Sequence, residues 1–453
     1  MNNQNKKMDL LGNASISRAL LAMGIPTMIG MLINALYNLV DAYFVGGLGE
    51  SQMGAISIVY PLGQVVVGLG LLFGNGAASY ISRLLGQGNK SLANKVASTS
   101  LYCSLSVGSV IIFFCVVFLK PILLFLGATE SILPYAMTYA EIYIISCIFN
   151  VFNVTMNNIV TSEGAAKTTM CALLIGAILN IALDPLFIYT FDLGIAGAAI
   201  ATAISQIISS LVYLCYILRR KSIFDFRLKE CSFSKEIFSE IFKIGVPTLV
   251  FQLLTSLSIS LTNNTAGTYG DAAIAGMGVV TRLVSMGSLT VFGFIKGFQP
   301  IAGYSYGAKK YDRLRQTIKT SILWSTIFCV IVGFAFFLFP AQIVSQFTTD
   351  NMELIRIGAN SLRINGITFM LFGYYTVYSS LFLALGKGKE GFLLGACRQG
   401  ICFIPVILIL PVVWGLNGIL YAQPIADILS TVITVFMAIP LHKQLRTAEV
   451  QTK

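Results

Sequence analysis

Hydropathy constrains this chain more than any other feature. Long, uninterrupted apolar stretches recur along its 453 residues. Each is long enough to cross a hydrocarbon core of about 30 Å, which takes roughly 20 apolar residues in a helix. Because the stretches do not alternate in polarity, a transmembrane β-barrel is disfavoured. The pattern predicts twelve transmembrane helices, with approximate cores at residues 17–44, 54–82, 93–118, 134–160, 167–189, 195–217, 241–265, 273–304, 317–340, 357–384, 391–412 and 416–440.

The composition excludes other classes of protein. Nine apolar and aromatic residue types make up 56% of the chain and charged residues only 11%, whereas soluble domains average about 25% charged residues. High hydrophobicity excludes intrinsic disorder, and nine cysteines in this length are too few for a disulfide scaffold. No Cys/His spacing points to a metal. We therefore expect an all-α membrane protein without a cofactor.

Lysine and arginine are distributed unevenly between the connections. The N-terminus, the even-numbered connections and the C-terminus hold or flank 24 of the 30 basic residues, whereas the odd-numbered connections hold two, Lys120 and Arg356. Because cytoplasmic loops carry the excess of positive charge, both termini are predicted to be cytoplasmic. This topology also explains the net charge of +11, so that no nucleic-acid partner is needed.

The two halves of the chain repeat each other at an offset of 221 residues. Residues 23–27 match residues 244–248, and Asn75-Gly76 matches Lys296-Gly297. Glycines that repeat at the same offset are Gly86 with Gly307, Gly194 with Gly415 and Gly197 with Gly418. Six helices per half give both halves the same orientation, related by an axis along the membrane normal. The predicted domains are residues 1–218 and 241–453, joined by a cytoplasmic linker at 219–240.

This duplication favours a secondary transporter. Two parallel six-helix bundles form a cavity at their interface, which is where such transporters place their substrate. A membrane enzyme is disfavoured, because the sequence offers no cluster of His, Cys or Ser/Lys residues for catalysis.

The first helix carries a polar stripe. Asn34, Tyr37, Asn38 and Asp41 follow one another at i, i+3, i+4 and i+7, and so share one helix face. A charge at the centre of a membrane costs at least about 2.5 to 3.5 kcal/mol, so this face should meet protein or water. Alternatively, Asp41 lies at the extracellular end of its helix and is simply solvated.

The fifth helix carries a second acidic position. Asp184 follows Asn180 by one turn and precedes Pro185, which should kink the helix and free the carbonyl of Ile181. A carboxylate, an amide and a free carbonyl can bind a small hard cation or a proton. The alternative is a helix cap before the next loop.

Two further helices have polar faces that suit either helix packing or ligand binding. They consist of Thr202, Ser205, Gln206 and Ser209 on the sixth helix and Asn150, Asn153 and Asn157 on the fourth.

The C-terminal half differs in charge. Its helices contain a single carboxylate, Asp427, beside the cations Arg282, Lys296, Arg363 and Arg398. We expect Asp427 to neutralise one of these cations.

Taken together, these motifs resemble the multidrug and toxic compound extrusion (MATE) family, specifically its DinF-like branch. The motifs are Gly-x-Pro at Gly24 and Gly245, the run from Tyr37 to Gly46, Asn180 to Pro185, and Gly194-x-x-Gly197.

The resemblance implies a V-shaped exporter of amphipathic, often cationic drugs, driven by H+ or Na+ antiport. It implies a coupling-ion site, able to hold Na+, at Asp41, Asn180, Asp184 and Thr202. Predicted substrate-binding residues are Asn34, Tyr37, Asn38, Asn153 and Asn157. Pro26 and Pro185 are predicted bending points.

The remaining expectations concern setting and cargo. We expect a monomer in the plasma membrane of a prokaryote. The competing function is a lipid-linked saccharide flippase of the same superfamily, since the cations Arg282, Lys296, Arg363 and Arg398 would suit an anionic cargo.

Overall fold

The computed structural model describes residues 3–346 and 352–452, and their regular structure is helical throughout. Within these residues, twelve helical spans are long and apolar enough to cross a membrane, which confirms the predicted all-α membrane fold. The elements are α1 (Asn3–Gly12), α2 (Ile16–Gly46), α3 (Glu50–Gly86), α4 (Lys90–Val117), α5 (Leu119–Phe125), α6 (Leu133–Ser162), α7 (Ala166–Pro185), η1 (Leu186–Thr190), α8 (Gly194–Leu218), η2 (Leu228–Glu230), α9 (Lys235–Gly267), α10 (Asp271–Gly307), α11 (Tyr311–Leu338), α12 (Pro340–Val344), α13 (Met352–Ala384), α14 (Gly388–Ala396), η3 (Cys397–Ile401), α15 (Phe403–Trp414) and α16 (Leu416–Thr452).

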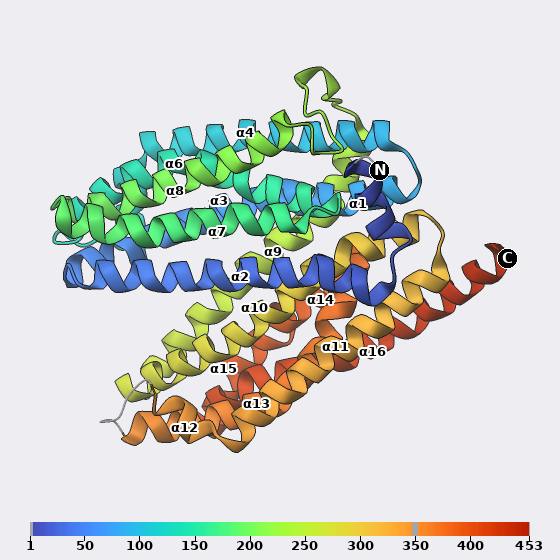
Figure 1. Cartoon of the computed structure of the whole chain (residues 1–453). Helices are drawn as coiled ribbons and strands as arrows, with labels where there is room; N and C mark the ends of the chain where they lie inside the picture. The colour runs from blue at the N-terminus through green and yellow to red at the C-terminus, as the bar shows by residue number, and fades with distance from the viewer. Residues whose placement is uncertain (1–2, 347–351, 453) are drawn as a thin grey trace.

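Two six-span bundles make up the molecule, as predicted (Figure 1). The spans up to α8 form the N-lobe, and those from α9 onward form the C-lobe. The lobes meet near the end that carries both chain termini, which we call the terminal end, and diverge toward the opposite, far end (Figure 1). The contacts between the lobes are made mainly by α2 and α3 with α9 and α10.

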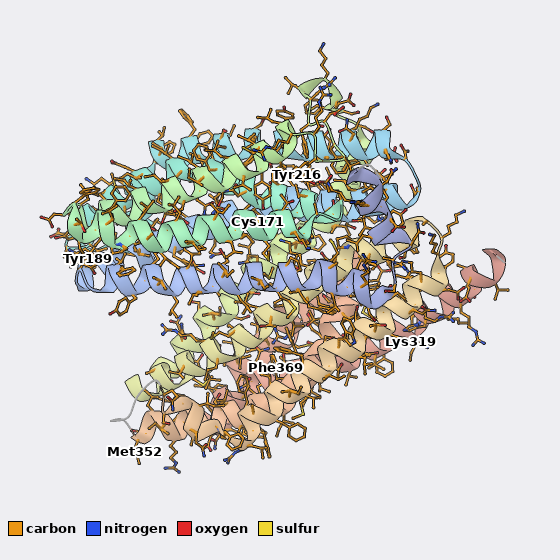
Figure 2. The ribbon with its side chains drawn as sticks, in the orientation of Figure 1. Cys171, Tyr189, Tyr216, Lys319, Met352 and Phe369 are labelled. Carbon is orange, nitrogen blue, oxygen red and sulfur yellow. The ribbon has the colours of Figure 1, made fainter. Side chains whose placement is uncertain are left out.

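Large apolar side chains cover the outside of both lobes. Phe125 and Val412, for example, are 89% and 85% exposed. A soluble monomer seldom exposes apolar patches of this extent, whereas a lipid-facing surface requires them. Figure 2 shows side chains projecting along the full length of the molecule; among those labelled, Tyr189 and Met352 lie at the far end and Lys319 lies near the terminal end.

Repeated glycines bring the backbones of the two lobes into contact. A Cβ atom on Gly76 in α3 would lie 2.3 Å from the carbonyl oxygen of Ile241 in α9. At the equivalent position in the C-lobe, a Cβ atom on Gly297 in α10 would lie 2.5 Å from the backbone nitrogen of Gly24 in α2. Only glycine permits approaches this close. The same repeat position therefore joins the lobes twice.

A buried polar cluster attaches α1 to the N-lobe at the terminal end. Glu163, which is fully buried after α6, accepts a hydrogen bond from Lys7 Nζ at 3.1 Å and another from the hydroxyl of Tyr216. On the C-lobe side, Arg313 donates to the carbonyl of Ala14 at 2.6 Å. The N-terminal segment thus contacts both lobes.

Proline and capping residues explain where the helices depart from expectation. Helix α7 ends at Pro185, and the span continues as the π-helix η1, so the expected irregularity takes the form of a wider turn. Helix α2 continues through Pro26. Ser234 caps α9 by accepting the N–H of Glu236 at 3.3 Å, so that the first C-lobe helix begins at Lys235 rather than at 241 and shortens the linker.

Candidate functional site

The polar residues of α7 lie together inside the N-lobe. Asn180 is 1% exposed and Asp184 is 0% exposed. Asn180 Nδ2 lies 3.3 Å from Asp184 Oδ1 and 3.4 Å from Thr202 Oγ1 of the neighbouring helix α8. The structure therefore brings together three of the four residues predicted to bind the coupling ion.

Several acceptor oxygens in this region are buried without a hydrogen-bond partner. They include Asp184 Oδ2, Asn180 Oδ1 and Asp41 Oδ1, together with the hydroxyl oxygen of Ser205 one turn after Thr202. A buried polar atom without a partner costs about 1 to 3 kcal/mol, and more when it is charged. Oxygen atoms gathered in this way have the chemistry of a site for a proton or a small hard cation.

Asp41 belongs to the same cluster. Its helix, α2, packs along α7, and the side chains of Asp41 and Asp184 are near enough to interact electrostatically. Two neighbouring carboxyl groups repel when both are ionised, and this repulsion favours uptake of a proton or another cation between them. All four predicted coupling-ion residues therefore meet in one place, on three different helices.

The remainder of the α2 stripe is less enclosed. Tyr37 is partly buried and lies near enough to interact with Asp41 and Asp184. Asn34 and Asn38 are exposed, and the amide of Asn38 donates to the backbone carbonyl of Asn34 at 2.6 Å. The stripe thus runs from the buried cluster to an accessible surface of α2.

The two predicted asparagines of α6 have different partners. Asn153 is held within the N-lobe, because its amide donates to the side chain of Gln206 at 2.8 Å and its oxygen accepts from Ser210 at 2.9 Å. Asn157 donates to the hydroxyl of Tyr213 at 3.3 Å, and its oxygen accepts a hydrogen bond from Lys296 of the C-lobe. Only Asn157 therefore joins the two lobes.

The acidic residue of the C-lobe has a different environment. Asp427 Oδ1 accepts from Arg398 Nε and from Gln423 Nε2, both at 2.8 Å. The guanidinium of Arg398 also lies 4.6 Å from the ring centre of Phe372. The expected neutralisation of a cation by Asp427 is confirmed, and one carboxylate oxygen of Asp427 has two donors. Arg282 and Arg363 are exposed.

The structure adds Ser205 to the residues that were predicted to form the ion site. Its spacing of three residues from Thr202 placed both on one face of the sixth helix, a face that suited helix packing or ligand binding equally well. The unpartnered hydroxyl oxygen of Ser205 distinguishes it from Ser209, whose hydroxyl donates to the carbonyl of Ala172 at 2.9 Å.

Known sequences match the chain along nearly its whole length. A sequence model of the MatE family matches residues 26–186 and 247–409, one segment in each lobe. The multidrug export protein MepA of Staphylococcus aureus (strain MSSA476) is 31% identical over 431 residues, which cover 95% of both chains. MepA of Staphylococcus saprophyticus is 31% identical over 421 residues, or 91% of both chains.

Solved structures match the fold equally well. The outward-facing conformation of a multidrug resistance MATE family transporter of the MOP superfamily superposes with a TM-score of 0.92, at 27% identity, over 98% of this chain and 99% of that one. A MOP superfamily transporter from Pyrococcus furiosus, described for the reverse polarity of its binding pocket, gives 0.91 at 27% identity, over 97% and 99% of the two chains.

Proposed function

Because this chain belongs to the MatE family of multidrug and toxic compound extrusion transporters, we propose that it exports small amphipathic cations in exchange for H+ or Na+. Relatives whose match covers 95% of their own length and 95% of this chain are named multidrug export proteins. Their names support the export of drugs. Because these relatives are named export proteins, we propose transport as the sole activity of the chain.

The buried acidic cluster of the N-lobe carries this proposal. Asp41 and Asp184 lie in a membrane-spanning bundle beside acceptor oxygens that have no donor. Such an arrangement is costly when it is empty and ionised, and binding of H+ or Na+ removes the cost. An ion that binds here can therefore change the stability of one conformation relative to another.

The mechanism that we propose is mutual exclusion between drug and ion. With the ion absent, the charge on Asp41 and Asp184 attracts a cationic drug to the polar stripe around Tyr37. Binding of the ion cancels that charge, so that the drug loses its counter-ion and leaves. The π-helix η1 directly follows Asp184 and Pro185, and irregular turns of this kind are frequent at functional sites.

The direction of transport follows from the topology that we propose. The excess of basic residues assigns the terminal end to the cytoplasm. The lobes are in contact at that end and diverge at the far end, so this conformation faces outward (Figure 1). The likeness to an outward-facing transporter of the family supports this assignment.

Three expectations remain predictions: that the chain belongs to the DinF-like branch, that it lies in the plasma membrane of a prokaryote, and that it is a monomer.

The basic residues of the C-lobe support a lipid-linked saccharide flippase less well than a drug exporter. Arg398 is neutralised by Asp427, and Arg282 and Arg363 are exposed. Among these four basic residues, Lys296 has a contact with the other lobe, and one such cation gives little support to a cavity built for a polyanionic lipid.

Transport in proteoliposomes tests the proposal. The purified protein is reconstituted, and uptake of a lipophilic cationic dye is followed under a pH gradient or a Na+ gradient, imposed separately. Dye movement that one gradient drives, and that Asp41→Asn and Asp184→Asn abolish, is the expected result. Dye movement driven equally in both variants would contradict the ion site.

A matched control is Asp192→Asn, just beyond η1. Asp192 is an exposed carboxylate with a φ of 55°, a conformation that asparagine also adopts readily. This variant removes one charge from the same segment and should transport like the unaltered protein.

A further inference from the structure

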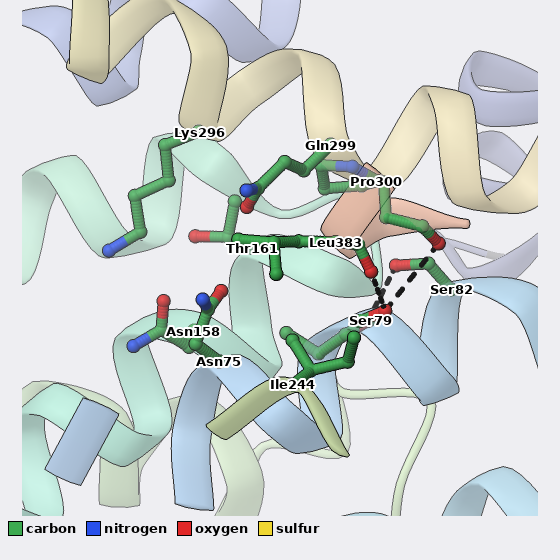
Figure 3. A pocket seen from close by; sticks show the side chains of 12 residues that line it. Asn75, Ser79, Ser82, Asn158, Thr161, Ile244, Lys296, Gln299, Pro300 and Leu383 are labelled. Carbon is green, nitrogen blue, oxygen red and sulfur yellow. Dashed lines mark hydrogen bonds between the residues drawn. The ribbon is translucent and has the colours of Figure 1, made fainter. Parts of the chain in front are cut away.

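A small cavity with polar and apolar lining lies between the lobes, beside the glycine contacts of α3 and α10 (Figure 3). Its volume of about 20 Å³ is room for about one water molecule. The cavity is lined from both lobes, and its polar lining includes Asn75, Asn158, Thr161, Lys296 and Gln299. Several amides and hydroxyls therefore share this cavity with a single basic side chain.

Lys296 alone is ionisable among the described residues that line this cavity. Its side chain extends from α10 toward Asn158 and Thr161 (Figure 3). The ammonium group donates to Asn157 Oδ1 in the N-lobe, and the ion pairs found among the described residues do not include Lys296. A cation in a membrane-spanning helix thus rests against a neutral amide.

The internal repeat shows that this position does not need a charge to join the lobes. The repeat equivalent of Lys296 is Asn75, and each residue precedes one of the contact glycines. Asn75 Nδ2 reaches across to Thr248 Oγ1 of the C-lobe at 2.8 Å. A neutral amide therefore makes the same kind of contact between lobes, so the charge of Lys296 calls for another explanation.

Asn157 connects this charge with the cargo. It belongs to the substrate-binding set that we propose, and its side-chain oxygen is an acceptor that the ammonium of Lys296 occupies in this conformation. When the lobes part at the terminal end, this hydrogen bond must break, because its two partners belong to different lobes. Lys296 then faces the interlobe space without that partner.

We propose that Lys296 is a charge-selecting residue, which favours cargo that carries a carboxylate as well as a cationic group over cargo that is cationic only. This inference rests on the proposed export function and deepens it. While the terminal end is open, the ammonium binds the carboxylate and the acidic cluster attracts the cationic group. A purely cationic molecule meets the same ammonium as a repulsive charge.

Closure of the terminal end then releases the carboxylate. As the lobes meet, the ammonium returns to Asn157, and the cavity that remains has room for about one water molecule. The carboxylate thereby loses its partner in the conformation that faces outward. Lys296 thus binds cargo more strongly in the loading conformation than in the releasing one, which is the difference that transport requires.

A matched pair of dyes tests this inference. Rhodamine 123 is a cationic methyl ester, and rhodamine 110 is the corresponding free acid, which is a zwitterion at neutral pH. Initial transport rates over a concentration series give kcat/KM for each dye in reconstituted protein. In Lys296→Met and Lys296→Gln, the preference for rhodamine 110 over rhodamine 123 should fall about tenfold, the effect of one charge-assisted hydrogen bond, mainly through KM.

Two controls complete the test. Lys296→Arg keeps the charge and should retain the preference, and Lys319→Met removes an exposed lysine of the neighbouring helix α11 and should leave both dyes unaffected. An unchanged preference in both Lys296→Met and Lys296→Gln overturns the inference while the export function stands. If the unaltered protein moves neither dye, the export function itself fails. Where a variant no longer transports, equilibrium binding of the two dyes to purified protein gives the same ratio, and an unchanged ratio overturns the inference.

Discussion

The N-lobe and the C-lobe each bury an aspartate in a membrane-spanning helix, but the two carboxylates differ in their hydrogen-bond partners. Asp184 is 0% exposed and retains a buried oxygen without a partner, whereas Asp427, at 9% exposed, is satisfied by Arg398 and Gln423. The repeat equivalent of Asp184 is Pro405. The duplication therefore gives both lobes one scaffold, and the partners of each acid decide whether it is part of the packing or an open site for an ion.

The largest expected effect distinguishes the two acids by transport. Asp184→Asn should abolish coupled export, because the ion can no longer bind where the drug does. Under a tenfold ion gradient, one coupled ion sustains about a tenfold dye gradient, and this ratio should fall to one in the variant. Dye accumulation in proteoliposomes measures it.

The matched change in the C-lobe is Asp427→Asn. It removes the buried carboxylate of the C-lobe and should leave the accumulation ratio near that of the unaltered protein. Loss of coupling in Asp427→Asn with coupling retained in Asp184→Asn would reverse the roles that we assign to the lobes.

The second effect concerns stability. Arg398→Met leaves Asp427 buried without its cation, which should cost about 3 to 5 kcal/mol of the free energy of unfolding. The double variant Arg398→Met/Asp427→Leu removes both charges and should recover most of that loss. Unfolding in mixed detergent micelles measures both. Equal instability of the single and double variants would show that the pair is not what stabilises this region.

The third effect tests the contact between the lobes. Gly297→Ala should cost about 1 to 3 kcal/mol, because the added methyl group meets the backbone of Gly24. Gly278→Ala in the same helix is the control, since nothing lies within 4 Å of the methyl group it would add. This control should be neutral or slightly stabilising in thermal unfolding. A neutral Gly297→Ala would contradict the close packing of the lobes.

The smallest effect concerns a hydroxyl in the ion site. Thr202→Val removes one oxygen near Asn180 and should weaken ion binding by about 1 kcal/mol, or roughly fivefold. Thr434→Val in the C-lobe is matched, because that hydroxyl is buried and bonds the carbonyl of Ser430 in its own helix. The ion concentration that half-saturates dye export measures both. Equal shifts in the two variants would contradict a site restricted to the N-lobe.

Much of the fold could be predicted from the sequence, because a membrane makes hydropathy decisive. The twelve spans, the repeat at 221 residues and the neutralisation of a cation by Asp427 follow from length, composition and charge. Local spacing also placed Asn180 and Asp184 on one face of α7, and the irregular backbone at Pro185 was expected from the missing N–H of proline.

Contacts between distant segments could not be predicted in this way. Lys7 and Glu163 are 156 positions apart, and Lys296 and Asn157 are 139 apart, so that no periodicity within a helix relates them. The π-helix η3 at Cys397–Ile401 contains no proline, so this sequence signal for an irregular turn is absent from it. Such features depend on how whole helices pack, and sequence spacing reports only on one helix at a time.

The most direct test of the account is whether drug binding displaces an ion from the acidic cluster. Purified protein in weakly buffered detergent solution is titrated with a lipophilic cationic dye, while released H+ or Na+ is measured with an ion-selective electrode. We predict release of one of these ions upon dye binding, and no release from a variant with both Asp41→Asn and Asp184→Asn. Equal release from the unaltered protein and from that double variant would contradict mutual exclusion at this site.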